Sequence, residues 1–260
     1  MSQLIGEALL QEAAEWNLFD VNARVGPSGI YGGLSLDADG LLAEMDRFWI
    51  RDAVVSHWTG EEYDATEGNV ALERDLRPRL TAAWAALQEP GFLDGLAARR
   101  PLAVRLTPGA NQHNFSLAGW CAGPLYEYLE EHSVITLIGR VDIDWDRLVA
   151  LMENFPRLVV VLLDCGYRAD RFLFPLLDRF PHLYLDGATY LAHRQLEAFV
   201  DQRGPERILF GTRLPLYTPA AALGVLASAR ISDGARRAIA GGNLRRLLAG
   251  CRNASGEVKG

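Results

Sequence analysis

Residues 148–165, Leu-Val-Ala-Leu-Met-Glu-Asn-Phe-Pro-Arg-Leu-Val-Val-Val-Leu-Leu-Asp-Cys, hold one complete helix-to-strand unit. Apolar residues three and four positions apart in its first half predict an amphipathic helix. The Asn-Phe-Pro-Arg sequence at 154–157 predicts the turn that ends this helix. The run 158–163 is apolar at every position, which is typical of a parallel strand buried on both faces. The strand ends at Asp164, where a polar side chain can face a site.

The same kind of unit recurs along the chain and predicts the fold class. Strands are predicted at Leu18–Asn22, Ala53–Ser56, Thr81–Leu87, Leu102–Leu106, Val134–Ile138, Leu158–Leu163, His182–Asp186 and Arg207–Phe210. About eight strand–helix units in roughly 250 residues is typical of a closed barrel. No Gly-x-Gly-x-x-Gly turn follows the first strand, which argues against an open dinucleotide-binding sheet. We therefore expect an α/β protein with a single (β/α)8 TIM barrel over residues 1–250 and a polar tail over 251–260.

The composition excludes several classes of partner. The chain has 260 residues, 26 basic and 33 acidic, and a formal net charge of −7. An acidic chain without a basic run is a poor ligand for nucleic acid or an anionic membrane. No apolar run approaches the roughly 18 residues of a membrane span, and the N-terminus lacks the basic region of a signal peptide. We expect a cytoplasmic protein without a nucleic-acid or membrane partner.

The candidate site residues come from the ends of the predicted strands, because barrel enzymes carry their chemistry at the C-terminal face. Proton transfer is assigned to Asp20, His57 and Asp164. The predicted ligand-binding residues are Asn22, Arg24, Arg105, Arg140, Arg213 and Tyr217. Asp142 and Asp186 also follow strands but receive no role.

Two interpretations of these side chains stay open. The permanent charge of Arg24 and Arg213, on strands that become neighbours when the barrel closes, favours a small anionic ligand. Alternatively, the arginines and aspartates form a buried structural network that fills the barrel mouth. His57 is also open to a structural interpretation, as a hydrogen-bonded residue after a strand.

Six segments, in chain order, resemble the motifs of one family. They are Phe-Asp-Val-Asn-Ala-Arg-Val-Gly at 19–26, residues 42–56, Ala-Val-Arg-Leu at 103–106, residues 155–166, Arg-Ile-Leu-Phe-Gly-Thr-Arg-Leu-Pro at 207–215, and Gly-Asn-Leu-Arg-Arg-Leu-Leu at 242–248. Together they resemble the amidohydrolase superfamily, in the amidohydrolase-related branch that includes aminocarboxymuconate-semialdehyde decarboxylase. The resemblance covers nearly the whole chain and implies a TIM barrel.

The departures from the family pattern fall on its metal ligands. The resemblance implies a divalent metal held by two first-strand histidines, histidines on strands five and six, and a strand-eight aspartate. The corresponding residues in this chain are Asn22, Arg24, Gly139, Asp164 and Arg213. Glycine and arginine cannot ligate a metal. We therefore expect the family's fold with its metal ligands replaced, and no metal or cofactor.

Three functions follow from this pattern. The first is a metal-independent hydrolase or lyase acting on a small anionic substrate at the barrel mouth. The second is an inactive pseudoenzyme that serves as a binding or regulatory subunit, as a homodimer or paired with a paralogue, with Trp120 and Trp145 as interface candidates. The third is a metal-dependent hydrolase with rearranged ligands, although none of the remaining histidines lies at the C-terminal end of a strand. Cys165 is interpreted as a buried thiol rather than a nucleophile, because no histidine adjoins it.

Overall fold

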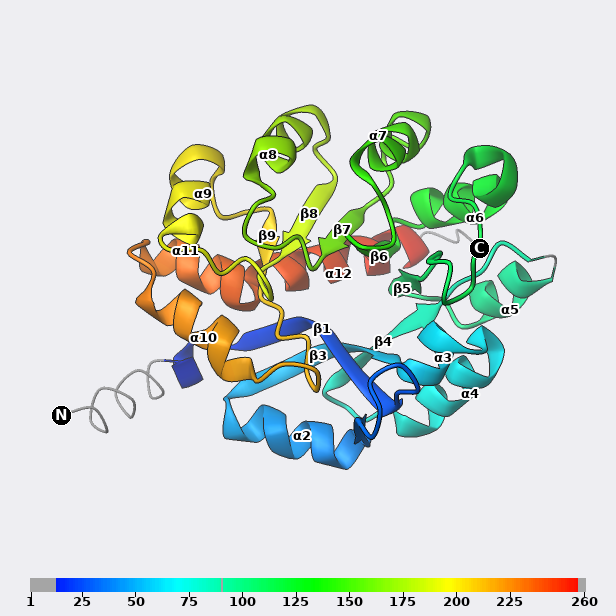
Figure 1. Cartoon of the computed structure of the whole chain (residues 1–260), viewed down its shortest axis with the longest axis horizontal. Helices are drawn as coiled ribbons and strands as arrows, with labels where there is room; N and C mark the ends of the chain where they lie inside the picture. Colours follow the sequence, from blue (N-terminus) through cyan, green and yellow to red (C-terminus); the bar gives the residue numbers. More distant parts are fainter. Residues whose placement is uncertain (1–12, 90, 257–260) are drawn as a thin grey trace.

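The computed structural model describes residues 13–89 and 91–256. Eight strands pair in parallel, each with the next: β1 (Leu18–Pro27), β3 (Ile50–His57), β4 (Leu80–Ala85), β5 (Ala103–Leu106), β6 (Ile135–Gly139), β7 (Val160–Leu163), β8 (Leu183–Asp186) and β9 (Ile208–Leu209). A short strand, β2 (Ser35–Leu36), pairs antiparallel with the end of β1. The sheet curls into a ring with the helices outside it (Figure 1).

Hydrogen bonds between β1 and the segment that follows β9 close the barrel. The amide of Val21 donates to the carbonyl of Phe210 at 3.0 Å, and the amide of Arg24 donates to the carbonyl of Leu214 at 2.9 Å. The buried carboxylate of Asp20 accepts from the Thr212 amide at 3.0 Å and from the Thr212 hydroxyl. The predicted (β/α)8 barrel is confirmed.

Helices follow each parallel strand and, except for α12, cover the outside of the ring. They are α2 (Ala38–Arg47), α3 (Trp58–Glu62), α4 (Ala65–Asp75), α5 (Phe92–Ala98), α6 (Gly119–Glu131), α7 (Trp145–Asn154), α8 (Asp170–Arg179), α9 (Gln195–Arg203), α10 (Pro219–Ser228) and α11 (Asp233–Arg237), then a π-helical turn η1 (Ala238–Gly242) and α12 (Asn243–Gly256). Helix α7 begins where the Asp144 side chain accepts from the Arg147 amide, and it buries Leu148 and Leu151 as the sequence predicts.

The apolar core has two layers, one between sheet and helices and one inside the barrel. The inner layer includes Phe19, Val54 and Val161, from three different strands, together with Leu248 of α12. The thiol of Cys251, also on α12, faces the carbonyls before β5 and β6. Helix α12 therefore packs across the N-terminal end of the barrel and leaves the C-terminal end open to ligands.

The observed boundaries differ from the sequence prediction at several places. Strand β1 continues beyond the predicted end at Asn22 to Pro27, and β3 starts at Ile50, before the predicted start at Ala53. Both added segments contain polar residues, which interrupt the apolar runs used for the prediction. Strand β2 has two residues and no apolar run to predict it. The predicted tail begins inside α12: the helix reaches Gly256, Cys251 is buried, and residues 257–260 lie outside the described part.

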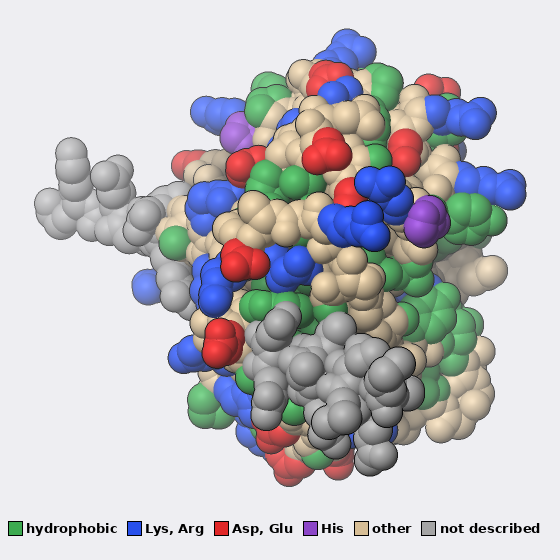
Figure 2. Space-filling view, turned by 90° about the vertical axis from the view of Figure 1, so that its left-hand side faces the viewer, with side chains coloured by type: hydrophobic (Ala, Val, Ile, Leu, Met, Phe, Trp, Pro, Cys, Tyr) green, Lys and Arg blue, Asp and Glu red, His purple; other side chains and the backbone are tan. Residues whose placement is uncertain are grey.

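The outer surface carries charges of both signs. On the face shown in Figure 2, acidic and basic side chains are interspersed rather than gathered into one basic patch. Among the helices of the described residues, none combines the length and the apolar character that a membrane span needs.

Candidate functional site at the barrel mouth

A cavity of about 290 Å³ lies at the C-terminal ends of the strands. Its lining comprises Arg24, Ile30, Tyr31, Trp58, Glu61, Glu62, Arg105, Gly109, Ala110, Asn111, Gln112, Gly139, Val141, Asp142, Asp164 and Arg213. These residues lie on the C-terminal parts of β1, β3, β5, β6, β7 and β9 or directly after them, so the barrel topology brings them together. Three arginines and four carboxylates share this one space.

The floor of the cavity is a buried ion network centred on Glu61. The Arg24 Nε donates to both carboxylate oxygens of Glu61, at 3.0 and 3.1 Å, and the Arg105 Nε lies 3.0 Å from Glu61 Oε2. The Ser56 hydroxyl also donates to Glu61. All three charged side chains are no more than 4% exposed. Burial raises the pKa of Glu61, while Arg24 and Ser56 oppose that rise.

Asn22 joins this network to the next layer of carboxylates. Its Oδ1 accepts from Nη1 of Arg24 at 3.0 Å and from Nη1 of Arg105 at 3.1 Å. Its Nδ2 donates to Asp186 at 2.7 Å. Burial, with the neighbouring charge of Asp164, raises the pKa of Asp186. Both ends of the Asn22 amide are therefore occupied by protein partners.

A second ion pair stands closer to solvent. The Arg213 Nε lies 3.1 Å from Asp164 Oδ2, and the Arg213 Nη1 donates to the Tyr217 hydroxyl at 3.2 Å. Both Asp164 and Arg213 have left-handed backbones, with φ values of 57° and 61°. The Asp164 Oδ1 is buried and accepts no hydrogen bond from the described residues. The Arg213 side chain is 17% exposed, against 3% for Arg24, so Arg213 is the more accessible cation of the two.

Asp142 brings another carboxylate to the cavity. A Cβ built on Gly139 would lie 2.5 Å from Asp142 Oδ2, and one built on Gly109 would lie 2.9 Å from Oδ1. The two glycines therefore leave the space that this carboxylate occupies. Burial raises the pKa of Asp142 to about 6, with Arg24 and Arg213 opposing and Asp164 assisting the rise.

The structure brings some of the predicted site residues together. Arg24, Arg105, Arg213 and Asp164 all line the cavity. Asn22 lies beneath them, and Tyr217 reaches Arg213 at the rim with 44% of its surface exposed. These six residues form two groups, which Asp186 links by accepting from the Asn22 side chain and from the Asp164 amide. One group is Asn22, Arg24 and Arg105, and the other is Asp164, Arg213 and Tyr217.

Three predicted residues stand apart from the cavity lining. The ring of His57 packs against Gly26, accepts from the Thr59 amide at 3.1 Å, and lies 4.0 Å from Asp75. This side chain caps α3, which fits the structural interpretation of His57.

Asp20 and Arg140 also have structural contacts. The Asp20 carboxylate is fully buried in the closure of β1 onto the segment after β9. Arg140 stacks over the Trp145 ring at 4.3 Å and donates to the Ile143 carbonyl at 2.7 Å. Cys165 is buried, and burial raises the pKa of its thiol, as an inert cysteine requires.

Sequence reasoning missed Glu61 and gave Asp142 no role. Glu61 lies on the short helix α3, five residues beyond the predicted end of the second strand. The available signal is the Glu-Glu pair at 61–62, in the short segment that follows the strand end. The alternation of side chains along β3 bears on His57. Residues two apart share a face of a strand, and Val54 points into the barrel, so Ser56 points inward and His57 does not.

The donor set at the mouth does not fit a resident divalent metal. Across the described residues, no group of three or more His, Cys, Asp or Glu side chains is placed to hold an ion. Arg24 and Arg213 bring two fixed positive charges to the cavity, and the Asn22 oxygen already accepts from two guanidiniums.

The fold and this site define a (β/α)8 barrel with its polar cavity at the C-terminal end. A family model described as Amidohydrolase matches residues 36–249. The chain therefore belongs to the amidohydrolase family, which confirms the resemblance drawn from its motifs. No curated protein is similar enough in sequence to count as a relative.

Solved structures of low sequence identity share the fold. An uncharacterised TIM-barrel protein from Bordetella bronchiseptica is 18% identical, with a TM-score of 0.72, and the match covers 90% of this chain and 99% of that one. A 2,6-dihydroxybenzoate decarboxylase bound to 2,6-dihydroxybenzoate is 16% identical with a TM-score of 0.75, over 90% and 99% of the two chains. A 5-carboxyvanillate decarboxylase from Sphingomonas paucimobilis is 14% identical with a TM-score of 0.63, over 90% and 99%.

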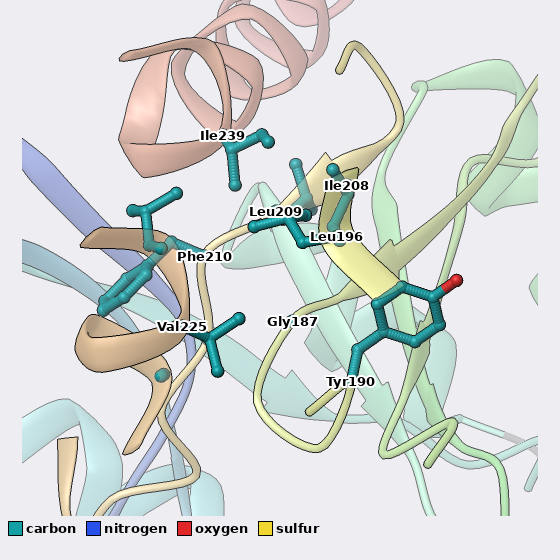
Figure 3. Close-up of a pocket in the computed structure, with 11 residues that line it drawn as sticks. Gly187, Tyr190, Leu196, Ile208, Leu209, Phe210, Val225 and Ile239 are labelled. Carbon is teal, nitrogen blue, oxygen red and sulfur yellow. The ribbon is translucent and has the colours of Figure 1, made fainter. Parts of the chain in front are cut away.

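A different, smaller void is excluded as a site. It lies between β9, α10 and η1, where Val225 and Ile239 face each other across it (Figure 3). Its volume of about 20 Å³ holds one water molecule at most. Because its lining is almost entirely apolar, we interpret it as a packing gap.

Proposed function

We propose that this protein is a metal-independent hydrolase or lyase that binds a small carboxylate at the mouth of the barrel. The observation that carries the proposal is the convergence of Arg24, Arg105 and Arg213 on one cavity of about 290 Å³. Guanidinium groups match carboxylates in geometry and charge, and they keep their charge at any physiological pH.

Arg213 is the residue that would meet the ligand first. Its Nε faces Asp164 and one Nη1 proton goes to Tyr217, so the Nη2 donors stay available for a carboxylate. Deeper in the cavity, Arg24 and Arg105 both pair with the single carboxylate of Glu61. Asp164 acts here as the residue that positions Arg213.

Asp142 is the group placed for proton transfer. Its carboxyl lines the cavity, and its pKa of about 6 lets it hold or release a proton near neutral pH. Asp20 and His57 are left out of the proposed catalytic set because their side chains do not line the cavity.

The class of ligand is taken from the structural neighbours. The names of two of them specify aromatic acids, 2,6-dihydroxybenzoate and 5-carboxyvanillate. In this chain, the rings of Tyr31 and Trp58 line the cavity and lie 5.6 Å apart, and they offer apolar contact to a ring-bearing acid.

A second candidate, a binding subunit without catalysis, is favoured by the closed network of Arg24, Glu61 and Arg105. A network in which these buried charges already pair with one another can be purely structural. The location in the cytoplasm, a homodimer and pairing with a paralogue are predictions from the sequence alone.

The test is calorimetric titration of the purified protein with benzoate and with 2,6-dihydroxybenzoate. We expect binding by the wild type and at least tenfold weaker binding by Arg213→Gln, while Arg47→Gln, on the exposed face of α2, binds like the wild type. Equal affinity of the two variants would contradict the proposed site. Proton NMR of the same mixtures then distinguishes an enzyme, which converts the acid, from a binding subunit, which leaves it unchanged.

A further inference from the structure

A second cavity, of about 590 Å³, adjoins the mouth. The loop between β5 and α6 forms one wall and α7 forms the other, and Phe115, Leu117 and Phe155 give it an apolar lining. It shares Gly109, Ala110, Val141 and Asp142 with the arginine-lined cavity. The two cavities therefore adjoin at these residues.

Two small residues, Gly109 and Ala110, and the side chains of Val141 and Asp142 form the boundary that the cavities share. Asp142 occupies the space that side chains on Gly109 or Gly139 would take. A bulkier residue at either glycine would collide with its carboxylate. The carboxyl of Asp142 therefore stands at the junction and faces both cavities.

The loop wall is fixed by hydrogen bonds within the described residues. The His113 Nε2 lies 2.7 Å from the Gly60 carbonyl and so ties the loop to α3. The amides of Gln112 and Asn114 donate to the Gly109 carbonyl at 2.9 and 3.1 Å. The second cavity is a built groove rather than the gap beside a loose loop.

The two cavities differ in chemistry. Three arginines line the first, whereas apolar side chains dominate one part of the second. We infer that the natural ligand is an amphipathic carboxylate, whose acid group binds Arg213 and whose apolar tail crosses Asp142 into the groove beside Phe115 and Phe155. This inference rests on the proposed function and adds the length and polarity of the substrate to it.

Straight-chain carboxylates from propionate to octanoate test the inference by titration calorimetry. Each methylene that enters the groove should tighten binding by about twofold to fourfold in the wild type, as burial of a methylene predicts. The variants Ala118→Trp and Ala150→Trp fill the groove from exposed positions on its two walls. In both variants, we expect propionate to bind with the affinity of the wild type. The increase in affinity with chain length should disappear.

The control is Ala221→Trp, an equally exposed alanine on α10 that lines neither cavity, which should keep the full gain. Affinity that stays constant from propionate to octanoate, with binding still dependent on Arg213, overturns this inference and leaves the proposed function standing. A gain that persists in both groove variants also overturns it. No binding of any acid overturns both proposals.

Discussion

At the scale of single residues, fixed positive charge stands at the positions where the family resemblance implies metal ligands. Arg24 and Arg213 each have a carboxylate partner, Glu61 and Asp164 respectively. Taking such charges out of water costs several kcal/mol per ion, and the pairing offsets that cost only when both partners are present. The carboxylates at the mouth are therefore structural necessities as well as candidate chemistry.

Glu61→Gln tests this dependence. The change leaves the buried Arg24 and Arg105 without a counter-charge, and we expect the free energy of unfolding to fall by about 3–5 kcal/mol. Urea unfolding followed by circular dichroism measures it. The matched control is Glu44→Gln, which removes an exposed pair with Arg47 and should cost under about 1 kcal/mol. Equal losses in the two variants would contradict the proposed role of Glu61.

Asp142→Asn tests the raised pKa of the group at the cavity junction. The pKa of Asp142 rises from 3.8 to about 6 on folding, so between these values the unfolded chain ionises while the folded one holds its proton. The contribution of Asp142 to stability is therefore present at low pH and lost as the pH rises through 6. Between pH 4 and pH 7, we expect the free energy of unfolding of Asp142→Asn to rise by about 1–2 kcal/mol relative to that of the wild type. This figure allows for solvent screening, because Asp142 is partly exposed.

Urea unfolding of the wild type and the variant at both pH values gives this difference. Asp201→Asn, at an exposed position of α9, is the control and should show a difference near zero. A pH-independent difference for Asp142→Asn would show that folding does not raise the pKa of this carboxyl, and would remove it as the proton-transfer group.

At the scale of elements, the strands are predictable and the directions of their side chains are only partly so. Apolar runs such as 158–163 identify buried parallel strands, and strand ends identify Arg24, Arg105, Arg213 and Asp164 as neighbours. A break in register between Asp20 and Ala23 of β1 changes which residues face inward, and no sequence signal marks it. Glu61 escaped prediction because it reaches the site from a one-turn helix.

The backbone conformation at the end of β1 requires a glycine at position 26. Gly26 has φ +83°, and a Cβ there would collide with the His57 ring. Gly33 has φ +78° with nothing within 4 Å of its Cβ position, so Gly33→Ala measures backbone strain alone, about 1–2 kcal/mol. We expect Gly26→Ala to cost about 1–3 kcal/mol more because of the collision.

A double-mutant cycle on unfolding free energies isolates that collision. His57→Ala in the Gly26→Ala background should recover the additional loss, since it removes the ring that the new methyl group meets. A purely additive cycle would show that the ring moves aside without cost, and that His57 does not fix the end of β1.

At the scale of the whole molecule, the barrel separates stability from chemistry. Helix α12 packs on the inner apolar layer at the N-terminal end, and the charged cavity opens at the other end. Eight strand–helix units were enough to predict this frame, because a closed parallel sheet places all strand C-termini on one face. The contents of the cavity could not be predicted as fully, because they depend on loops and on the short helix α3.

Because Arg24 and Arg213 stand where the family resemblance implies metal ligands, we expect this protein to hold no metal. Protein purified without chelators or a histidine tag should contain far less than one equivalent of zinc, manganese or iron by elemental mass spectrometry. An ion that binds the folded protein raises its melting temperature by mass action. Because Arg24 and Arg213 repel cations from the cavity, excess Zn²⁺ or Mn²⁺ should leave the melting temperature unchanged. A family member that keeps both first-strand histidines, measured alongside, should hold metal and melt earlier after chelation. A stoichiometric metal in this protein would instead support a hydrolase with rearranged ligands, and Asp142, Asp164 and Asp186 would be the first residues to substitute in search of them.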